Sequence, residues 1–331
     1  MGGGAGSSYS GGLVNASGAS ASGRTPGGVA APGYVAGVGV GGVGNSDGTP
    51  SGSGLVTLQA CVALSAPAAQ PAPSWPCGSN TTPITTAFAY TGAPASYVAP
   101  AKTVAVYASL QGGGGGGGRS STGAGGAFLS GWVGVPFLPP AATNYTVLVG
   151  AGGNYSVASS GAQQPGLGGA AKAANDCCSC TGPGAGPAAL GVLGAFPSTA
   201  QGTYAFLPLA VAGAGGNGGE TRRGAPATAD GTASFAPIAG NGSCFGAGNN
   251  GYPGSSATLA GGGVVGCSTG TVTTAGYTVG NGKQLTLPMA LVSGGPGFGC
   301  GGAGGGGYFG GGGGGCVVSP SIAAHARAHS H

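Results

Sequence analysis

The sequence predicts an all-β protein in which antiparallel β-structure packs with a bundle of polyglycine-II helices, with little or no α-helix. Three observations lead to this prediction. Short runs rich in β-branched and aromatic residues alternate with glycine tracts, no helical period persists, and strong helix formers such as Glu and Lys are scarce. The chain has 331 residues, of which 83 are Gly and 24 are Pro, about a third of the total.

A Gly and Pro share of this size usually indicates low complexity or disorder. Here the rest of the composition disagrees, because only 4% of the residues are charged and 41% are hydrophobic. Disordered chains are typically charged and poor in apolar residues. Glycine does not recur at every third position throughout, so a collagen helix is excluded. We therefore expect collapse or assembly rather than a solvated coil.

The expected strands are short β-forming runs bounded by Gly, Pro or polar residues. They are Leu55–Leu64, Thr86–Tyr90, Thr103–Leu110, Ala127–Val133, Tyr145–Gly150, Thr203–Gly213 and Gln284–Gly294. In the third run apolar and polar side chains roughly alternate, which is the period of a half-buried strand. We expect Trp132 and Phe137 in the β core, and Tyr308 and Phe309 against the flank of the glycine bundle.

A Pro-rich stretch divides the chain. The expected organisation is an N-terminal segment (1–64), a Pro-rich linker (65–85), a glycine-rich domain (86–318) and a C-terminal tail (319–331).

Glycine tracts occur at Gly112–Gly118, Gly150–Gly153, Gly213–Gly219, Gly261–Gly263 and Gly294–Gly315. A polyproline-II-like helix of glycine has about three residues per turn and no internal hydrogen bonds. Buried backbone groups need partners, so one such helix alone is unstable. Several side by side can pair sideways, because no side chain holds them apart. Repeated tracts favour a bundle, whereas a linker needs only one.

Ionisable residues are too few for ordinary acid–base catalysis. The acids are Asp47, Asp176, Glu220 and Asp230, and the histidines are His325, His329 and His331. The net charge of +4 is spread thinly, with only Arg222 and Arg223 adjacent, which does not suit a nucleic-acid binder. No apolar run is long enough to span a bilayer. We expect no enzymatic activity, no cofactor, no metal site, no nucleic-acid partner and no membrane span.

Nine cysteines are candidates for disulfides: Cys61, Cys77, Cys177, Cys178, Cys180, Cys244, Cys267, Cys300 and Cys316. The Cys177–Cys180 cluster lacks a second pair at a metal-site spacing, so half-cystines are favoured over metal ligands. Sequons for N-glycosylation begin at Asn15, Asn80, Asn144, Asn154 and Asn241. Both features point to an extracellular, cell-surface or virion-surface location. The first residues do not resemble a secretory leader, so either a leader was removed or the protein reaches its place without one.

The order of these features resembles the glycine-rich domain family. The resemblance is carried by "FAYTGAPASYVAPAKTVAVYASLQGGGGGGG" (Phe88–Gly118), "TNYTVLVGAGG" (Thr143–Gly153), "FLPLAVAGAGGNGG" (Phe206–Gly219) and "GGGGYFGGGGGG" (Gly304–Gly315). It covers about 86–318, and Lys102 stands where the family often has Gly. The family includes extracellular regions of the anaplastic lymphoma kinase and leukocyte tyrosine kinase receptors and many viral and bacterial surface proteins. It implies a hydrogen-bonded bundle of glycine helices beside a β-structure.

The sequence differs from the family in the order of its ends. Family members usually close with "GGGGSSY", a loop and a last strand, whereas similar pieces stand here at Gly2–Gly18 and Gly37–Ala60. The domain therefore looks circularly permuted. Residues 1–64 are expected to complete either their own fold or that of a neighbouring subunit.

These features predict a structural subunit of an extracellular fibre, appendage or virion surface assembly. It would be a homo-oligomer or homopolymer joined head-to-tail by strand or glycine-helix complementation and stabilised by disulfides. The alternative is an adhesion or receptor-binding module on a rigid glycine scaffold, with a glycan or protein receptor. Its candidate binding loops are Gly161–Cys180 and Asn217–Gly231.

Overall fold

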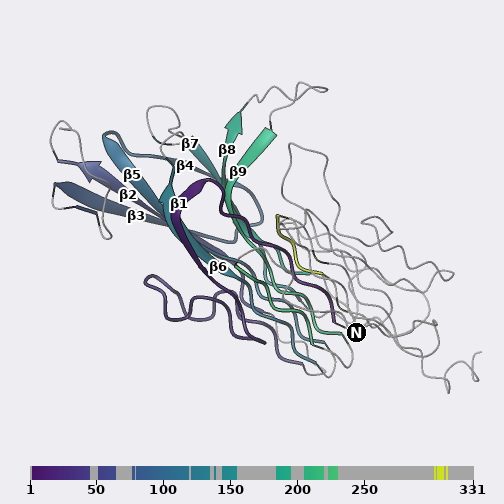
Figure 1. Ribbon diagram of the computed structural model, residues 1–331. Coiled ribbons are helices and arrows are strands. Elements are labelled where there is room, and N and C mark those ends of the chain that lie inside the picture. The colour runs from purple at the N-terminus through teal and green to yellow at the C-terminus, as the bar shows by residue number, and fades with distance from the viewer. Residues whose placement is uncertain are drawn as a thin grey trace, which may run out of the picture.

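The computed structural model (Figure 1) forms two antiparallel β-sheets. It describes residues 2–44, 51–64, 77–78, 80–118, 121–134, 138, 144–154, 184–194, 205–219, 223–229, 302, 304–308 and 311. No helix occurs among these residues. The described part of the chain confirms the prediction of an all-β protein with antiparallel strands.

One sheet has five strands in the spatial order β1-β6-β5-β2-β3. Their bounds are β1 Leu13–Ala19, β2 Leu55–Ala63, β3 Thr81–Ala89, β5 Thr103–Gln111 and β6 Phe128–Val133. Strand β2 pairs along its whole length with β3, from Leu55 opposite Ala89 to Ala63 opposite Thr81. Two strands from residues 1–64 therefore lie in one sheet with three strands from later in the chain.

The second sheet has four strands in the order β4-β7-β8-β9. Their bounds are β4 Ala95–Val98, β7 Asn144–Val149, β8 Ala188–Gly194 and β9 Ala205–Ala212. Strand β9 lies at the edge of this sheet, but it pairs with the N-terminal segment through an isolated antiparallel bridge between Tyr9 and Val211. The N-terminal part of the chain thus reaches both sheets.

The two sheets pack face to face around one hydrophobic core, which makes a β-sandwich. Alternation along each strand decides which residues enter it, since successive side chains point to opposite faces. In β2, Val56 and Leu58 are fully buried, whereas Leu55 and Thr57, which alternate with them, are half-buried on the outer face. The other sheet contributes Val147 and Leu190, which are also 0% exposed.

Two tyrosines belong to this core. Tyr145 is fully buried and its ring centroid lies 6.1 Å from that of Tyr97, which meets Phe88 edge-on at 6.0 Å. Burial raises the pKa of Tyr145 to about 12, with a smaller contribution from Tyr97. Burial also raises the pKa of Tyr97. Both phenols therefore stay neutral in the packed sandwich.

Most expected strands are present. The runs at residues 55–64, 103–110, 127–133, 145–150 and 203–213 correspond to β2, β5, β6, β7 and β9. The expected run Thr86–Tyr90 lies mostly in β3. Strand β3 begins at Thr81, so it also includes residues that we assigned to the Pro-rich linker, and it contains Pro83. Proline is tolerated there because β3 lies at the edge of its sheet. The expected strand Gln284–Gly294 lies outside the described residues.

Three strands were not predicted: β1, β4 and β8. Strand β1 is mostly exposed, β4 has only four residues, and β8 consists of Ala, Gly, Leu and Val. The prediction that Trp132 lies in the core was wrong. It is half-buried on the outer face of β6, opposite the core-facing Leu129 and Val133, and meets Tyr107 edge-on at 5.1 Å. Phe137 and Phe309 lie outside the described residues.

Candidate functional site: a bundle of glycine segments

Extended glycine-rich segments continue from the ends of the strands. Strand β5 runs into residues 112–118, the chain returns through 121–127 into β6, and β9 continues into 213–219. Figure 1 shows such segments side by side beyond one end of the sandwich, with the N-terminus at their far end. We call them the glycine bundle, which comprises the described residues within 2–8, 38–44, 51–54, 112–118, 121–127, 150–154, 184–187, 213–219, 223–227 and 302–311.

Backbone hydrogen bonds between neighbouring segments recur at every third residue. In the antiparallel pair that follows β5, the N–H groups that donate and the carbonyls that accept are Gly112 to Ala127 (2.9 Å), Gly115 to Ala124 (2.7 Å) and Gly118 to Ser121 (2.7 Å). A strand in an antiparallel sheet would repeat its pairing every two residues. The three-residue repeat therefore distinguishes these segments from ordinary β-strands.

The same repeat joins segments that are distant in the sequence. The N-terminal segment donates to β9 and to the segment after it through Gly3 to Asn217 (2.8 Å), Gly6 to Ala214 (2.9 Å) and Tyr9 to Val211 (2.8 Å). Parallel neighbours show it too, through Gly215 to Gly113 (3.0 Å) and Gly218 to Gly116 (2.8 Å).

One segment bonds to more neighbours than a sheet allows. The backbone of residues 213–219 exchanges hydrogen bonds with the segments 2–8, 112–118, 121–127, 223–227 and 302–311. A strand in a sheet has a neighbour on each of two sides only. Residues 213–219 are thus surrounded by other backbones, and all of them are buried.

Glycine is required because neighbouring backbones occupy the space of a side chain. A methyl group on Gly115 would lie within 3.0 Å of the backbone of Gly216, and one on Gly118 would lie equally close to the backbone of Gly219. Real Cβ atoms essentially never approach so closely. Alanines share one small apolar cluster within the bundle: Ala5, Ala127, Ala225 and Ala227. The bundle therefore admits a methyl group only at particular positions.

Two polar side chains add hydrogen bonds to the backbone of the glycine bundle. The Asn217 side chain is 2% exposed, and its Oδ1 accepts a hydrogen bond from the N–H of Gly116 at 2.8 Å. At the junction with the sheet, Gln111 Nε2 donates to the carbonyls of Gly126 (3.0 Å) and Ala127 (3.1 Å). The Asn217 contact gives the buried N–H of Gly116 its partner. The two carbonyls that accept from Gln111 also accept backbone hydrogen bonds, from Gly27 and Gly112.

Sequence reasoning found only part of the bundle. The predicted tracts at 112–118, 150–153 and 213–219 belong to it. It missed the partners at 121–127 and 223–227, where Ala, Ser, Thr or Pro interrupt the glycines. Segments 2–8 and 38–44 fall within Gly2–Gly18 and Gly37–Ala60, the pieces that resemble the closing part of a glycine-rich domain. A search for every third residue being Gly or Ala would have been a better signal. Gly261–Gly263 and most of Gly294–Gly315 lie outside the described residues.

One disulfide is present among the described residues. It joins Cys61 of β2 to Cys77, with Cα atoms 5.5 Å apart and a sequence separation of 16 residues. Cys61 is fully buried. The other candidates, Cys177, Cys178, Cys180, Cys244, Cys267, Cys300 and Cys316, lie outside the described residues, so their pairing stays a prediction.

The sequons differ in their surroundings. Asn15, Asn80 and Asn144 are exposed, and all three belong to the sandwich. Asn154 is half-buried in the glycine bundle. Asn241 lies outside the described residues.

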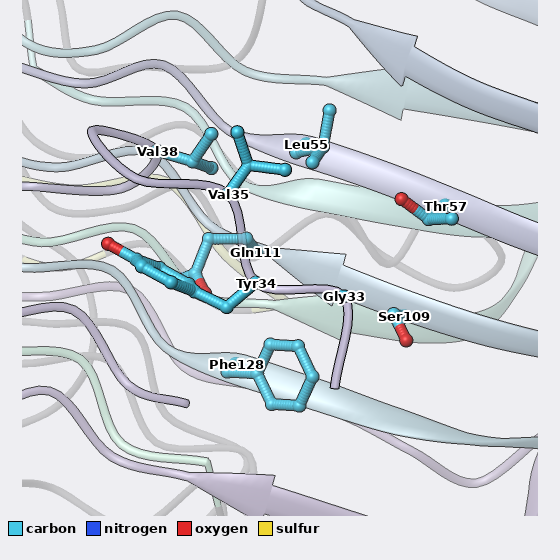
Figure 2. Close-up of a pocket in the computed structure, with 9 residues that line it drawn as sticks. All are labelled: Gly33, Tyr34, Val35, Val38, Leu55, Thr57, Ser109, Gln111 and Phe128. Atoms are coloured by element: carbon cyan, nitrogen blue, oxygen red, sulfur yellow. The ribbon is translucent and has the colours of Figure 1, made fainter. Parts of the chain in front are cut away.

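A small pocket lies between a loop and the outer face of the five-stranded sheet (Figure 2). The loop contributes Tyr34, Val35 and Val38, and the sheet contributes Gln111 and Phe128 among others. Its volume is about 10 Å³, near the minimum that one water molecule needs. This pocket is therefore too small for an organic ligand.

The candidate binding loops of the adhesion hypothesis do not form a described site. Gly161–Cys180 lies outside the described residues. The described parts of Asn217–Gly231 belong mainly to the bundle, where Gly224, Ala225 and Ala227 are buried. That segment is therefore a packing element over much of its length rather than an open loop.

All four acids and all three histidines of the chain lie outside the described residues. Within the part that is described, no group of three or more His, Cys, Asp or Glu side chains is arranged to hold a metal ion. The same residues include no helix that is long and apolar enough to cross a membrane.

The last described segment meets the N-terminal segment through an aromatic stack. The rings of Tyr9 and Tyr308 are nearly parallel, with centroids 4.4 Å apart and an interplanar angle of 16°. Both rings pack against Val211 and Ala189. Burial raises the pKa of Tyr308, and Tyr9 adds to this. Tyr308, which we expected against the flank of the glycine bundle, thus packs on Tyr9 and on residues of β8 and β9.

Comparison of the chain with protein-family models, curated protein sequences and solved structures finds no significant match.

Proposed function

We propose that this chain is a structural subunit of an extracellular fibre, appendage or virion surface layer, built around a rigid bundle of polyglycine-II helices. The three-residue recurrence of backbone hydrogen bonds carries the proposal. It equals the number of residues in one turn of such a helix. Because this helix has no internal hydrogen bonds, it is stable only among neighbours, and residues 213–219 bond to five other segments.

The composition supports a mechanical role over a catalytic one. The chain has four acids and three histidines in 331 residues, which leaves few groups for proton transfer. A backbone that is paired in several directions resists bending, because any bend must break hydrogen bonds between segments. The Cys61–Cys77 disulfide suits an oxidising environment.

The order of motifs supports membership of the glycine-rich domain family in a circularly permuted form. In a permuted domain, the N-terminal segment takes the place of a closing C-terminal segment. The contacts of residues 2–19, which we call the N-terminal arm, suit this role. Its glycine part bonds to 209–217 and 304–308, and its strand β1 forms an edge of the five-stranded sheet.

The N-terminal arm is the element through which subunits would join. In the single chain it completes its own fold, chiefly through backbone hydrogen bonds and the stack of Tyr9 on Tyr308. A second copy has the same arm and can form the same contacts. If each copy inserts its arm into the next copy instead of into itself, the contacts repeat head-to-tail and produce an open polymer.

Two measurements test this function. Negative-stain electron microscopy of the full chain at high concentration should show filaments or sheets, and dispersed monomers alone would contradict the proposal. Zero-length photo-oxidative cross-linking of a mixture of isotopically light and heavy chains then tests arm exchange. Exchange predicts cross-linked Tyr9–Tyr308 peptides with one light and one heavy member, whereas self-completion gives only unmixed pairs.

A further inference from the structure

The open edges of the sandwich coincide with exposed sequons. The sheet order leaves β1 and β3 as edges of one sheet and β4 and β9 as edges of the other. An unpaired edge strand invites pairing with another chain. The edge of β9 is occupied, because Tyr9 and Val211 exchange backbone hydrogen bonds at 2.8 and 2.7 Å and Gly12 donates to Leu209. Among the described residues no segment pairs with the other three edge strands in this way; residues 227–229 lie only beside the end of β1, where Ala21 donates to Ala227 and Gly18 lies against Ala229.

Each of these three edges has a sequon on it or beside it. Asn15 lies within β1, Asn80 immediately precedes the first residue of β3, and Asn144 stands opposite Val98 of β4. All three asparagines are exposed.

Each of the same edge strands also exposes a large apolar side chain. The exposed fractions are 51% for Val14 in β1, 42% for Ile84 in β3 and 64% for Val98 in β4. An exposed hydrophobic residue on an open edge increases the risk of strand-to-strand aggregation. The strands already carry features that limit pairing, namely a register shift in β1, Pro83 in β3 and the short length of β4.

We propose that Asn15, Asn80 and Asn144 are N-glycosylated and that their glycans shield the three open edges of the sandwich. The proposal rests on the extracellular setting of the proposed function. The donor is a lipid-diphosphate-linked oligosaccharide, transferred by the oligosaccharyltransferase of a secretory pathway. A bond forms between the asparagine Nδ2 and sugar C1, the bond from C1 to the diphosphate oxygen breaks, and the amide loses one proton as the lipid diphosphate leaves.

The local geometry accommodates a glycan at these sites. Asn15 has a positive φ of 50° and lies at the register shift of β1. Its neighbours Val14 and Ala16 are exposed as well. At Asn144, Oδ1 accepts a hydrogen bond from Ser96 Oγ at 2.6 Å, which leaves the glycan-bearing nitrogen out of that contact. A bulky, hydrated sugar at either position faces solvent.

The sequon at Asn154 provides an internal contrast. Its backbone lies against Gly116, so closely that a methyl group on Gly116 would meet it within 3.0 Å. A glycan there would compete with packing of the glycine bundle. The inferred pattern is therefore glycans on the sandwich and none on the described part of the bundle, whose flanks stay free for contact with other subunits.

Site mapping tests the proposal directly. The full chain is expressed behind a cleavable leader in a eukaryotic secretory host, and peptides are analysed before and after enzymatic release of N-glycans. Glycans are expected on Asn15, Asn80 and Asn144 and not on Asn154. The variants Ser17→Ala, Thr82→Ala and Thr146→Val should each remove one glycan.

The control variant Ser156→Ala removes the sequon at Asn154 and should leave the mass of the glycans unchanged. A bare asparagine at an edge site of the secreted, folded protein would overturn the assignment for that edge, as would a glycan at Asn154 in place of the edge sites. These outcomes do not depend on whether filaments form, so failure of the structural function is recognised separately.

Edge shielding has its own readout. A triple variant that combines Ser17→Ala, Thr82→Ala and Thr146→Val lacks all three edge glycans. Sedimentation and light scattering should show that it aggregates at lower concentration than the glycosylated chain. The Ser156→Ala variant should behave like the unmodified sequence. Equal solubility of the triple variant and the glycosylated chain would overturn the shielding role.

Discussion

The substitution Gly115→Ala tests whether the glycine segments are packed against one another. The new methyl group would lie within 3.0 Å of three backbone atoms of Gly216 and Asn217. Relief requires residues 112–118 to move away from 213–219, which disturbs the bonds of Gly215 to Gly113 (3.0 Å) and of Gly218 to Gly116 (2.8 Å) that join them.

The expected cost has two parts. Overpacking a tight interior costs about 1–3 kcal/mol. One buried backbone group that loses its partner adds about 1–3 kcal/mol. The total of about 2–6 kcal/mol is a large fraction of a typical unfolding free energy of about 5–15 kcal/mol.

The assay is equilibrium unfolding in urea, followed by circular dichroism. The matched control is Gly78→Ala, because a methyl group on Gly78 meets nothing within 4 Å and the residue has no positive φ. This control should change the unfolding free energy by less than about 1 kcal/mol. If Gly115→Ala proved as stable as Gly78→Ala, the close packing of the segments would be refuted.

Three further predictions concern the sandwich. Replacing Cys61 and Cys77 by Ala should lower the unfolding free energy by about 3 kcal/mol, because the bond closes a loop over a sequence separation of 16 residues; an unchanged urea midpoint would contradict this. Burial raises the pKa of Tyr145 to about 12 from an ordinary 10.0, so the stability it contributes is fully present below pH 10 and is lost as the pH rises towards 12. Urea unfolding across that range should show this loss, and Tyr145→Phe should reduce it. Leu58→Ala should cost about 2–5 kcal/mol in thermal or urea unfolding, whereas Leu64→Ala, at a site 66% exposed, should cost less than about 0.5 kcal/mol.

Local patterns in the sequence were sufficient to predict the strands that bury one face. Strand β5 was recognised from its alternation, and from Val106 onwards Ala108 and Leu110 are buried as alternation requires. At its start, where the register with β2 shifts, Val104 is half-buried and Ala105 is buried instead. Strand β1 could not be recognised in this way, because none of its side chains is fully buried. Its pairing with β6 comes from tertiary position rather than from local preference.

The glycine segments show a different limit. Their tracts are visible in the sequence, but the partners at 121–127 and 223–227 carry Ala, Thr and Pro and resemble ordinary loops. Which segments meet is decided by the strands that lead into them, as when β5 and β6 hold 112–118 against 121–127. The sequence therefore predicts that a bundle can form, whereas the sandwich determines its neighbours.

The candidate glycosylation sites illustrate the same limit. A sequon is a three-residue motif, and both Asn15 and Asn154 match it, so the sequence alone predicts glycosylation at the two sites equally. The fold separates them, because one lies on an exposed sheet edge and the other within the bundle.

Hydrogen–deuterium exchange of the glycine segments, read by mass spectrometry, tests the central claim most directly. If the backbones of residues 112–118 and 213–219 satisfy one another, their amides should exchange as slowly as those of the buried strand β5. Exchange at the rate of an unstructured glycine peptide would contradict the paired bundle, and the proposed structural function would lose its basis.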